Sequence, residues 1–383
     1  MGRASGLEAE LQRFIAWFWE ACLPHWAERG ANADGGFFES LDFDGRPRLD
    51  EPRRVRVQSR QIHVFATAAR LGRHPRARML AEGGLDYVRR FASPEDGRRG
   101  CVHLLAPDGA ILDDRRDLYD QAFLMLACAS SAGAFLYEPA LALAARTLAF
   151  LEAEMKAPGG GYFEDDKATR PRRQNPHMHL FEAMLALYAA TGDAEFLGRA
   201  AALKAVLQVR FLDARAGALR EFFTDDLSAP DPARGDIVEP GHMAEWVWLL
   251  ESYRSLSGGE VGQEQRLLYR RARELGEGKA GFLVNSTVLG AEPRGRRRLW
   301  PQTEYLKASL VMARRGETGA AERAERLVGA LFASYLDRPL AGLWCDEFDG
   351  QGLPIAGAVP ASIVYHLMEA ALEAEKHLKE VRA

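Results

Sequence analysis

The chain has 383 residues, of which 47% are hydrophobic and 27% are charged. This is the composition of a folded globular protein, and it excludes disorder, collagen and coiled coil for the chain as a whole. With 50 Lys and Arg against 54 Asp and Glu, the formal net charge is −4, so the chain has no general attraction to nucleic acid or anionic membranes.

The N-terminal segment carries charges where a secretory signal needs an apolar stretch. The four cysteines, Cys22, Cys101, Cys128 and Cys345, lie far apart and form no C-x-x-C pair, so we expect neither a disulfide framework nor a zinc ribbon. We therefore expect a cytoplasmic protein with no membrane span and no nucleic-acid partner.

One short pattern recurs along the chain: glycines, an aromatic or apolar pair, and then acidic residues or Asp-Gly. Its six copies are spaced by 56 to 64 residues and are anchored on Gly36, Gly100, Gly161, Gly217, Gly281 and Gly342. The copies have the alternation of short β-hairpins. Two helix-like stretches separate successive copies, for example Asp117–Ser131 and Pro139–Met155.

Six such helix pairs, with short β-hairpins at one end, predict an all-α fold, a closed (α/α)6 barrel. We expect one catalytic domain over residues 1–383, with one helix of each pair lining the inside. An open α-solenoid also stacks helix pairs, but it needs atypical capping repeats, and neither terminal unit here looks atypical.

The first cluster of polar residues on an expected inner helix holds Arg60 and His63, which are three residues apart and share a face. An arginine on a largely buried face needs a partner. A core carboxylate and a ligand are equally good readings for Arg60, whereas a satisfied core position is favoured for His63.

The second cluster places Asn175, His179 and Glu182 on one helix face, with His177 pointing elsewhere. On a helix the two side chains of H-x-H diverge, so a metal pair is disfavoured. The third cluster follows a Pro-Gly turn and holds His242 and Glu245 at i and i+3. There a carboxylate beside the imidazole suits a general base.

The fourth cluster opens a helix with Trp300, Gln302 and Glu304, an aromatic ring beside amide and acid groups, as a sugar site uses. Just before it, the segment 294–298 (RGRRR) is read as a solvated loop, or less favourably as an anion site. The fifth cluster holds His366 in an apolar helical stretch. The remaining histidines lie in loops or on charged faces and receive no role: His25, His74, His103 and His377.

Six motifs in register resemble those of the N-acylglucosamine 2-epimerase superfamily, which also contains mannose isomerase, sulfosugar isomerase and cellobiose 2-epimerase. They are QSR-x-x-x-x-F around Arg60, Y-x-Q-A-F from Tyr119, N-x-H-x-H-x-x-E-A from Asn175, P-G-H-x-x-E-W from Pro240, W-P-Q-T-E from Trp300 and P-A-S-x-x-Y-H-L from Pro360. The likeness spans almost the whole chain, and the fold that it implies is again an (α/α)6 barrel.

The resemblance implies a sugar site and two acid/base histidines, His242 and His366. With His179 and Arg60 these form the expected catalytic set. The expected substrate-binding residues are Tyr119, Asn175, Glu182, Glu245, Trp300 and Glu304. No cofactor and no catalytic metal are expected, and a homodimer is compatible with the family.

The mechanism that we expect begins with ring opening assisted by His179, after which a neutral histidine removes the C2 proton and Arg60 stabilises the enediol. Wording such as PHMHLFEA favours a metal-independent D-mannose/D-fructose isomerase. The alternative is a 2-epimerase acting on N-acylglucosamine/N-acylmannosamine, mannose/glucose or cellobiose. Cellobiose epimerases carry Trp where this chain has Ala361, which weakens the cellobiose case. More distant alternatives are a glycoside hydrolase on the same fold, which needs opposed carboxylates, and a non-catalytic binding protein.

Overall fold

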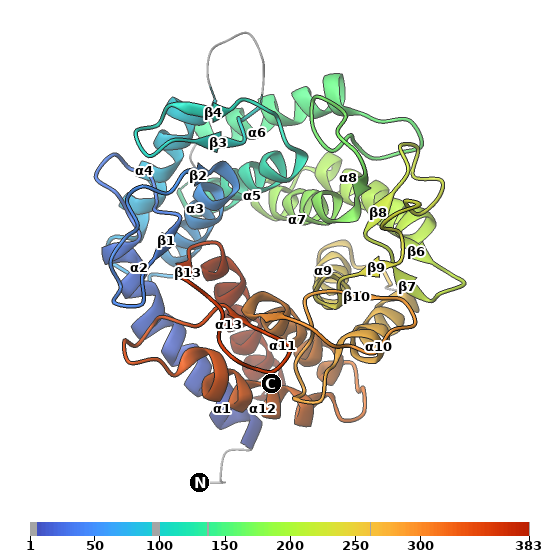
Figure 1. Ribbon diagram of the computed structural model, residues 1–383. Helices are drawn as coiled ribbons and strands as arrows, with labels where there is room; N and C mark the ends of the chain where they lie inside the picture. Colours follow the sequence, from blue (N-terminus) through green and yellow to red (C-terminus); the bar gives the residue numbers. More distant parts are fainter. Residues whose placement is uncertain (1–5, 94–99, 136–137, 261, 383) are drawn as a thin grey trace.

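The computed structural model describes residues 6–93, 100–135, 138–260 and 262–382. Its helices form two concentric layers around one axis (Figure 1). The inner helices are α3 (Val55–Arg70), α5 (Leu118–Phe135), α7 (Gln174–Thr191), α9 (Pro240–Ser257), α11 (Leu299–Arg314) and α13 (Ile363–Arg382).

The outer helices alternate with the inner ones along the chain, and several end in a π-helical turn. They are α1 (Gly6–Ala16) with η1 (Trp17–Cys22) and α2 (Leu23–Arg29), α4 (Ala77–Tyr87) with η2 (Val88–Ala92), α6 (Glu138–Phe150) with η3 (Leu151–Met155), α8 (Ala194–Val206) with η4 (Leu207–Phe211), α10 (Glu264–Gly276), and α12 (Ala320–Leu331) with η5 (Phe332–Leu336). Inner helices α5, α7 and α11 are apolar on most of their surface, because neighbouring helices cover them on all sides.

The ring closes where the two ends of the chain meet. Helix α1 packs against α12 and α13, and α13 packs against α3. Trp26 of α2 stacks on Trp344, which precedes α13, with ring centroids 5.5 Å apart, and both side chains are fully buried. The predicted (α/α)6 barrel is confirmed, and the open solenoid is excluded by this closure.

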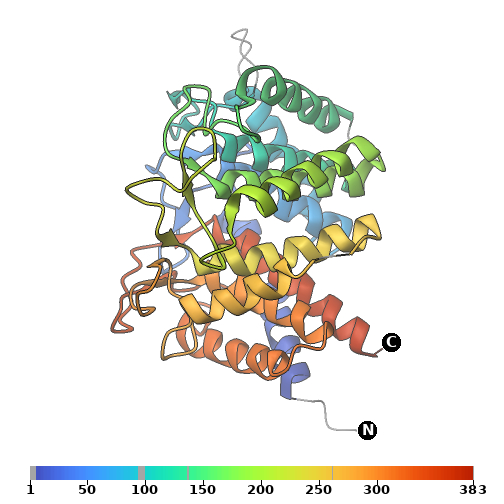
Figure 2. The same cartoon turned by 90° about the vertical axis from the view of Figure 1, so that its right-hand side faces the viewer.

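The strands lie together at one end of the barrel (Figure 2). They are β1 (Ser40–Leu41), β2 (Arg53–Arg54), β3 (Leu104–Leu105), β4 (Ile111–Asp113), β5 (Arg172–Arg173), β6 (Leu212–Asp213), β7 (Ala218–Leu219), β8 (Phe222–Phe223), β9 (Ile237–Val238), β10 (Thr287–Val288), β11 (Arg297–Arg298), β12 (Glu347–Phe348) and β13 (Val359–Pro360).

Short local hairpins enclose several of the recurring glycines, as the sequence predicts. Strands β6 and β7 pair across Gly217, and single bridges join Ala31 to Phe37, Lys156 to Tyr162 and Glu277 to Leu283. Strands also pair between neighbouring units, in the β1–β13, β2–β3, β5–β8, β9–β10 and β11–β12 pairs. Strands of two or three residues offer few hydrogen bonds on their own, and pairing with the next unit satisfies more of their backbone.

Buried amide side chains attach three of the inner helices to the glycine-containing segment before each of them. Gln58 bonds both the backbone N–H and the C=O of Phe37, Gln121 does the same to Cys101, and Gln302 to Leu283. In the third unit His177 takes this position, where its Nε2 accepts from the N–H of Tyr162. The recurring sequence pattern therefore marks a recurring backbone clamp.

None of the helices in the described part of the chain has the length and apolar character that crossing a bilayer requires.

Candidate active site

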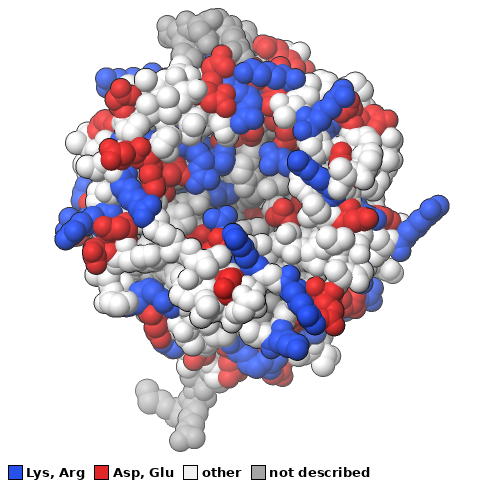
Figure 3. Space-filling model, viewed as in Figure 1, with Lys and Arg blue, Asp and Glu red and all other residues white. Residues whose placement is uncertain are grey.

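The inner helices all begin at the strand-bearing end of the barrel, so their N-termini converge there. Viewed from this end, the molecule is hollowed near its centre, and Lys and Arg side chains border the hollow (Figure 3). A cavity of about 240 Å³ lies there. Because six helix dipoles point their positive ends toward this region, it favours negative charge.

Eight of the ten predicted site residues line this cavity. They come from all six inner helices and are Arg60, Tyr119, Asn175, His179, His242, Glu245, Trp300 and His366. Residues more than 300 positions apart in the chain thus meet at one site.

Arg60 presents its charge to the cavity and pairs with no carboxylate among the described residues. Its Nη2 donates to the Tyr119 hydroxyl at 2.9 Å, and its Nη1 donates to the Ser362 carbonyl at 3.3 Å. Its guanidinium lies over the Phe123 ring, 4.2 Å from the centroid. The geometry therefore favours the ligand reading of Arg60 over a core ion pair.

His242 is bound by carboxylates outside its own helix. Its Nδ1 lies 3.0 Å from Glu221 Oε2 and 3.5 Å from Glu239 Oε2. Burial lowers the pKa of His242, but the charges of Glu221 and Glu239 outweigh burial and raise the pKa to about 10. His242 is therefore an imidazolium at neutral pH.

This corrects the expected partner of His242. Glu245 shares its helix face but makes no hydrogen bond to it, because side chains on a helix tilt toward the N-terminus and His242 lies in the first turn of α9. His242 therefore faces the residues before the helix. Its high pKa suits a proton donor rather than the general base expected from the sequence.

His366 has the opposite charge state. Its Nδ1 lies 2.8 Å from Glu304 Oε1, and Glu304 Oε2 lies 2.7 Å from Lys307 Nζ in an ion pair that is fully buried. Burial lowers the pKa of His366 well below its usual 6.5, and the charges of Arg60 and Lys307 lower it further. With Nδ1–H donated to Glu304, the free lone pair is on Nε2.

His179 is also neutral, since burial and then the charges of Arg60 and His242 lower its pKa well below 6.5. Its Nδ1 lies 2.9 Å from Glu182 Oε2, and Glu182 also accepts a hydrogen bond from the Tyr365 hydroxyl. Its Nε2 lies 3.9 Å from Glu245 Oε1. The Glu182 carboxylate thus fixes the ring of His179 from behind.

Several polar atoms of the cavity have no hydrogen-bond partner among the described residues. They include both carboxyl oxygens of Glu245, Asn175 Oδ1 and Arg60 Nε. Burial and the neighbouring Glu304 raise the pKa of Glu245 well above its usual 4.5, which favours the protonated form of this carboxyl group. Buried unpaired polar groups are costly, and a hydroxylated ligand would satisfy them.

The indole of Trp300 packs beside both His242 and His366. Its ring centroid is 5.0 Å from that of His242 and 5.7 Å from that of His366. The ring therefore offers an apolar surface, of the kind that packs on a sugar CH face, directly beside two imidazoles.

Two predicted binding residues, Glu182 and Glu304, lie behind the cavity rather than on its wall. They are 5% and 0% exposed, and their carboxylates are occupied by His179 and His366. Their expected substrate-binding role is therefore replaced by a positioning role, because a carboxylate held by an imidazole and sealed from the cavity does not reach a ligand.

The histidines expected outside the site do not line the cavity. His63 bonds Ser130 and Glu369, in agreement with the core reading. His103 lies in a loop, as expected, and bonds the buried Asp120. The expectation for His377 is wrong, because His377 lies on α13 and is 6% exposed rather than on a charged face. Its burial depends on contacts between helices that the sequence order does not reveal.

Three groups of site residues have ligand atoms close enough to hold a metal ion. They are His179 with Glu182 and Glu245, Glu221 with Glu239 and His242, and Glu245 with Glu304 and His366. In each group the imidazole is already hydrogen-bonded or ion-paired to a carboxylate of the protein. One ring nitrogen of each imidazole therefore already has a partner within the protein.

The sequence matches the family of N-acylglucosamine 2-epimerase (GlcNAc 2-epimerase) over residues 36–370. The chain belongs to the N-acylglucosamine 2-epimerase family. A sugar is therefore the substrate, and the chain is a sugar isomerase or epimerase.

Relatives within the family carry both kinds of name. Mannose-6-phosphate isomerase of Rhizobium meliloti (strain 1021) is 37% identical, covering 98% of this chain and 100% of that protein. D-mannose isomerase of Thermobifida fusca is 26% identical, covering 87% of each. Cellobiose 2-epimerase from Spirochaeta thermophila DSM 6192 superposes with a TM-score of 0.87 at 22% identity, covering 98% of each chain, and shows the shared fold.

Sequence reasoning missed Glu221, Glu239, Lys307 and Arg54, all of which shape the site. For the segment 294–298, which contains Arg298, it offered an anion site only as the less favoured alternative. Glu239 is three residues before His242, a spacing that could have revealed it. Glu221 lies in the preceding loop, 21 positions away, where no helical spacing applies.

Proposed function

We propose that this family member is a metal-independent aldose–ketose isomerase that interconverts a mannose-type aldose and its ketose. The observation that carries the proposal is the pairing of a neutral His366 with a cationic His242 on either side of Trp300, both facing the same cavity. The names of the relatives, mannose-6-phosphate isomerase and D-mannose isomerase, support a mannose-type substrate, free or phosphorylated.

The chemistry follows from the charge states. After ring opening, His366 Nε2 accepts the proton from C2, which is acidic because it lies next to the carbonyl. Arg60 stabilises the charge that develops on oxygen. The remaining hydroxyl proton passes from O2 to O1, and His242 adds a proton to C1 to give the ketose.

Ring opening needs a proton donor and an acceptor near the ring oxygen and the C1 hydroxyl. The neutral His179 and the protonated Glu245, whose facing atoms are 3.9 Å apart, are suited to these roles. The two groups carry complementary protonation states at the same place on the wall.

A 2-epimerase is the second candidate. If His242 delivered its proton to the opposite face of C2, the product would be the 2-epimer. The position of the two histidines on either side of Trp300 fits that outcome as well, and the family description names it.

The test is the activity of EDTA-treated protein on D-mannose, with His366→Ala and His242→Ala as variants. Each variant should lose at least about a hundredfold in rate, as expected for removal of a general acid or base. His74→Ala, at a half-buried loop position away from the cavity, is the matched control and should keep the parent rate. Severalfold losses in both site variants, or activity that EDTA abolishes and a divalent metal restores, would contradict the proposal.

A further inference from the structure

Three arginines at the cavity mouth are not used by the proton-transfer chemistry. Arg54 and Arg298 directly precede helices α3 and α11, and Arg56 lies in the first turn of α3. All three line the same cavity as the catalytic histidines. Because Arg60 lies a full turn further along α3, these three side chains occupy the entrance rather than the floor.

Each of the three is held from behind by an acidic side chain that does not line the cavity. Arg54 pairs with Glu39, Arg56 with Asp120 and Arg298 with Asp346. The arginine side chains are 36%, 19% and 46% exposed, whereas those of their partners are 11%, 0% and 5% exposed. The cations therefore face the cavity, and the anions are turned away from it.

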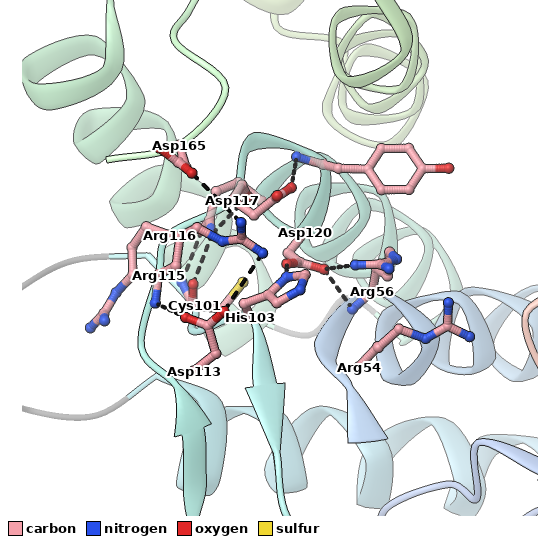
Figure 4. Close-up of polar contacts among 12 residues, drawn as sticks. Arg54, Arg56, Cys101, His103, Asp113, Arg115, Arg116, Asp117, Asp120 and Asp165 are labelled. Carbon is pink, nitrogen blue, oxygen red and sulfur yellow. Dashed lines mark hydrogen bonds and ion pairs between the residues drawn. The ribbon is translucent and has the colours of Figure 1, made fainter. Parts of the chain in front are cut away.

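Arg56 is anchored by Asp120, which lies behind it (Figure 4). Asp120 Oδ1 accepts from the Arg56 backbone N–H at 3.1 Å and from Nη1 at 3.4 Å, while Asp120 Oδ2 lies 2.5 Å from His103 Nδ1. This arrangement fixes one edge of the guanidinium and leaves Nε and Nη2 without a hydrogen-bond partner among the described residues. It also gives His103 a role, since His103 orients the carboxylate that orients Arg56.

Arg298 and Arg54 are likewise fixed on one edge of the guanidinium by a carboxylate. Arg298 uses Nε toward Asp346, and Arg54 uses Nε and Nη2 toward Glu39. Their other terminal nitrogens are free within the described part of the chain. Of the lining residues only Glu239 and Glu245 are acidic; the first faces His242, and burial favours the protonated form of the second. The mouth therefore carries an excess of positive charge.

We propose that Arg54, Arg56 and Arg298 form a binding site for a phosphate ester on the carbon of the sugar farthest from C1, so that the substrate is a hexose 6-phosphate. This inference rests on the proposed function, because it requires C1 and C2 to lie at the histidines. Guanidinium groups bind phosphate oxygens through paired N–H donors, and three of them match a dianion.

The placement also suits the reaction. Helices α3 and α11, at whose N-terminal ends the arginines lie, both pack against α13, which carries His366. A phosphate held between them would place the far end of the sugar at the mouth, above His366, and leave the reacting end inside. A cavity of about 240 Å³ is smaller than the range of about 300–1,000 Å³ that is common for drug-sized ligands, which suits one sugar ring.

The test compares kcat/KM for mannose 6-phosphate with kcat/KM for mannose in the parent and in Arg298→Gln, Arg54→Gln and Arg56→Gln. The parent should prefer the phosphorylated sugar, and each variant should lose at least about tenfold of that preference, the effect of removing one charged hydrogen bond. Arg294→Gln is the matched control: it lies in the same loop as Arg298, pairs with Glu292 and does not line the cavity. Its preference should equal that of the parent.

Further arms separate the possible results. A sugar with a sulfonate in place of the phosphate tests whether one negative charge suffices; equal preference for the sulfonate would overturn the dianion assignment. Conversion of free mannose with no preference for the phosphate, and no change in any arginine variant, would overturn this inference and leave the proposed function intact. The Arg56→Gln variant leaves Asp120 buried without its cation, so the melting temperature of this variant is measured as well. If this variant unfolds, the sugar preferences of Arg298→Gln and Arg54→Gln decide the test.

If neither sugar is converted, the proposed function fails, and the phosphate site is decided by equilibrium binding. Calorimetry of the parent protein with mannose 6-phosphate and with mannose should then still show tighter binding of the phosphate, lost in Arg298→Gln. Equal binding of the two sugars would overturn the inference.

Discussion

Two histidines that share one cavity are held in opposite charge states by what lies behind them. His242 has two carboxylates, Glu221 and Glu239, and no cation of its own, whereas His366 shares Glu304 with the buried Lys307. The same imidazole group is thereby cationic at one position and neutral at the other. In the proposed mechanism this separation of pKa values makes His242 the proton donor and His366 the proton acceptor.

Glu221→Gln tests this assignment. The active form needs a protonated His242, so kcat/KM should fall as pH rises through its pKa of about 10. Removing the charge of Glu221 should lower that pKa and move the alkaline limb to lower pH by about one unit or more. The measurement is the pH profile of kcat/KM together with the NMR titration of the His242 ring.

Glu239→Gln is the comparison variant, since Glu239 is farther from Nδ1, 3.5 Å against 3.0 Å, and partly exposed. It should move the alkaline limb by less. An alkaline limb that stays in place in Glu221→Gln would show that the charge of His242 does not limit the reaction.

At the scale of the element, the inner helices explain which parts of the site the sequence reveals. Residues three or four apart share a helix face, so Asn175, His179 and Glu182 could be grouped from spacing alone. Which helices face one another, and which loop covers each, depends on the closed ring. For that reason helical spacing predicts the wrong partner for His242. It gives no signal for Arg54, which lies in a strand of two residues, and it does not decide between a solvated loop and an anion site for the segment that ends at Arg298.

The motifs also contain residues whose role is structural. In W-P-Q-T-E, Trp300 lines the cavity, whereas Gln302 clamps Leu283 and is fully buried. A sequence motif does not separate these roles, because both kinds of residue sit on the same helix, and only the direction of the side chain distinguishes them.

Gln302→Leu should therefore destabilise the fold. The replacement has a similar size but leaves the N–H and C=O of Leu283 buried without partners, at about 1–3 kcal/mol for an unsatisfied group. We expect urea unfolding to show a loss of about 2 kcal/mol or more. Gln12→Leu, on the exposed side of α1, should change the free energy of unfolding by less than about 0.5 kcal/mol, and an equally small effect of Gln302→Leu would contradict the clamp.

In the whole molecule, the ring and the repeat were predictable because each unit carries the same glycine-containing pattern and the units fill the chain. The pairing of strands from neighbouring units was not predictable, because it depends on contacts between units. Closure brings together residues from every unit, and this accounts for a site in which six inner helices each contribute at least one side chain to one cavity.

In the proposed mechanism, two histidines move protons between C2 and C1 through an enediol. The most direct test of this mechanism is NMR of the metal-free protein incubated with D-mannose in D2O, with the His366→Ala variant measured in parallel. We predict fructose carrying one deuterium at C1, because the proton that His242 delivers has exchanged with solvent, and no conversion by the variant. Glucose labelled at C2 without fructose would instead show a 2-epimerase, and fructose that keeps the original C2 hydrogen at C1 would contradict transfer between two histidines.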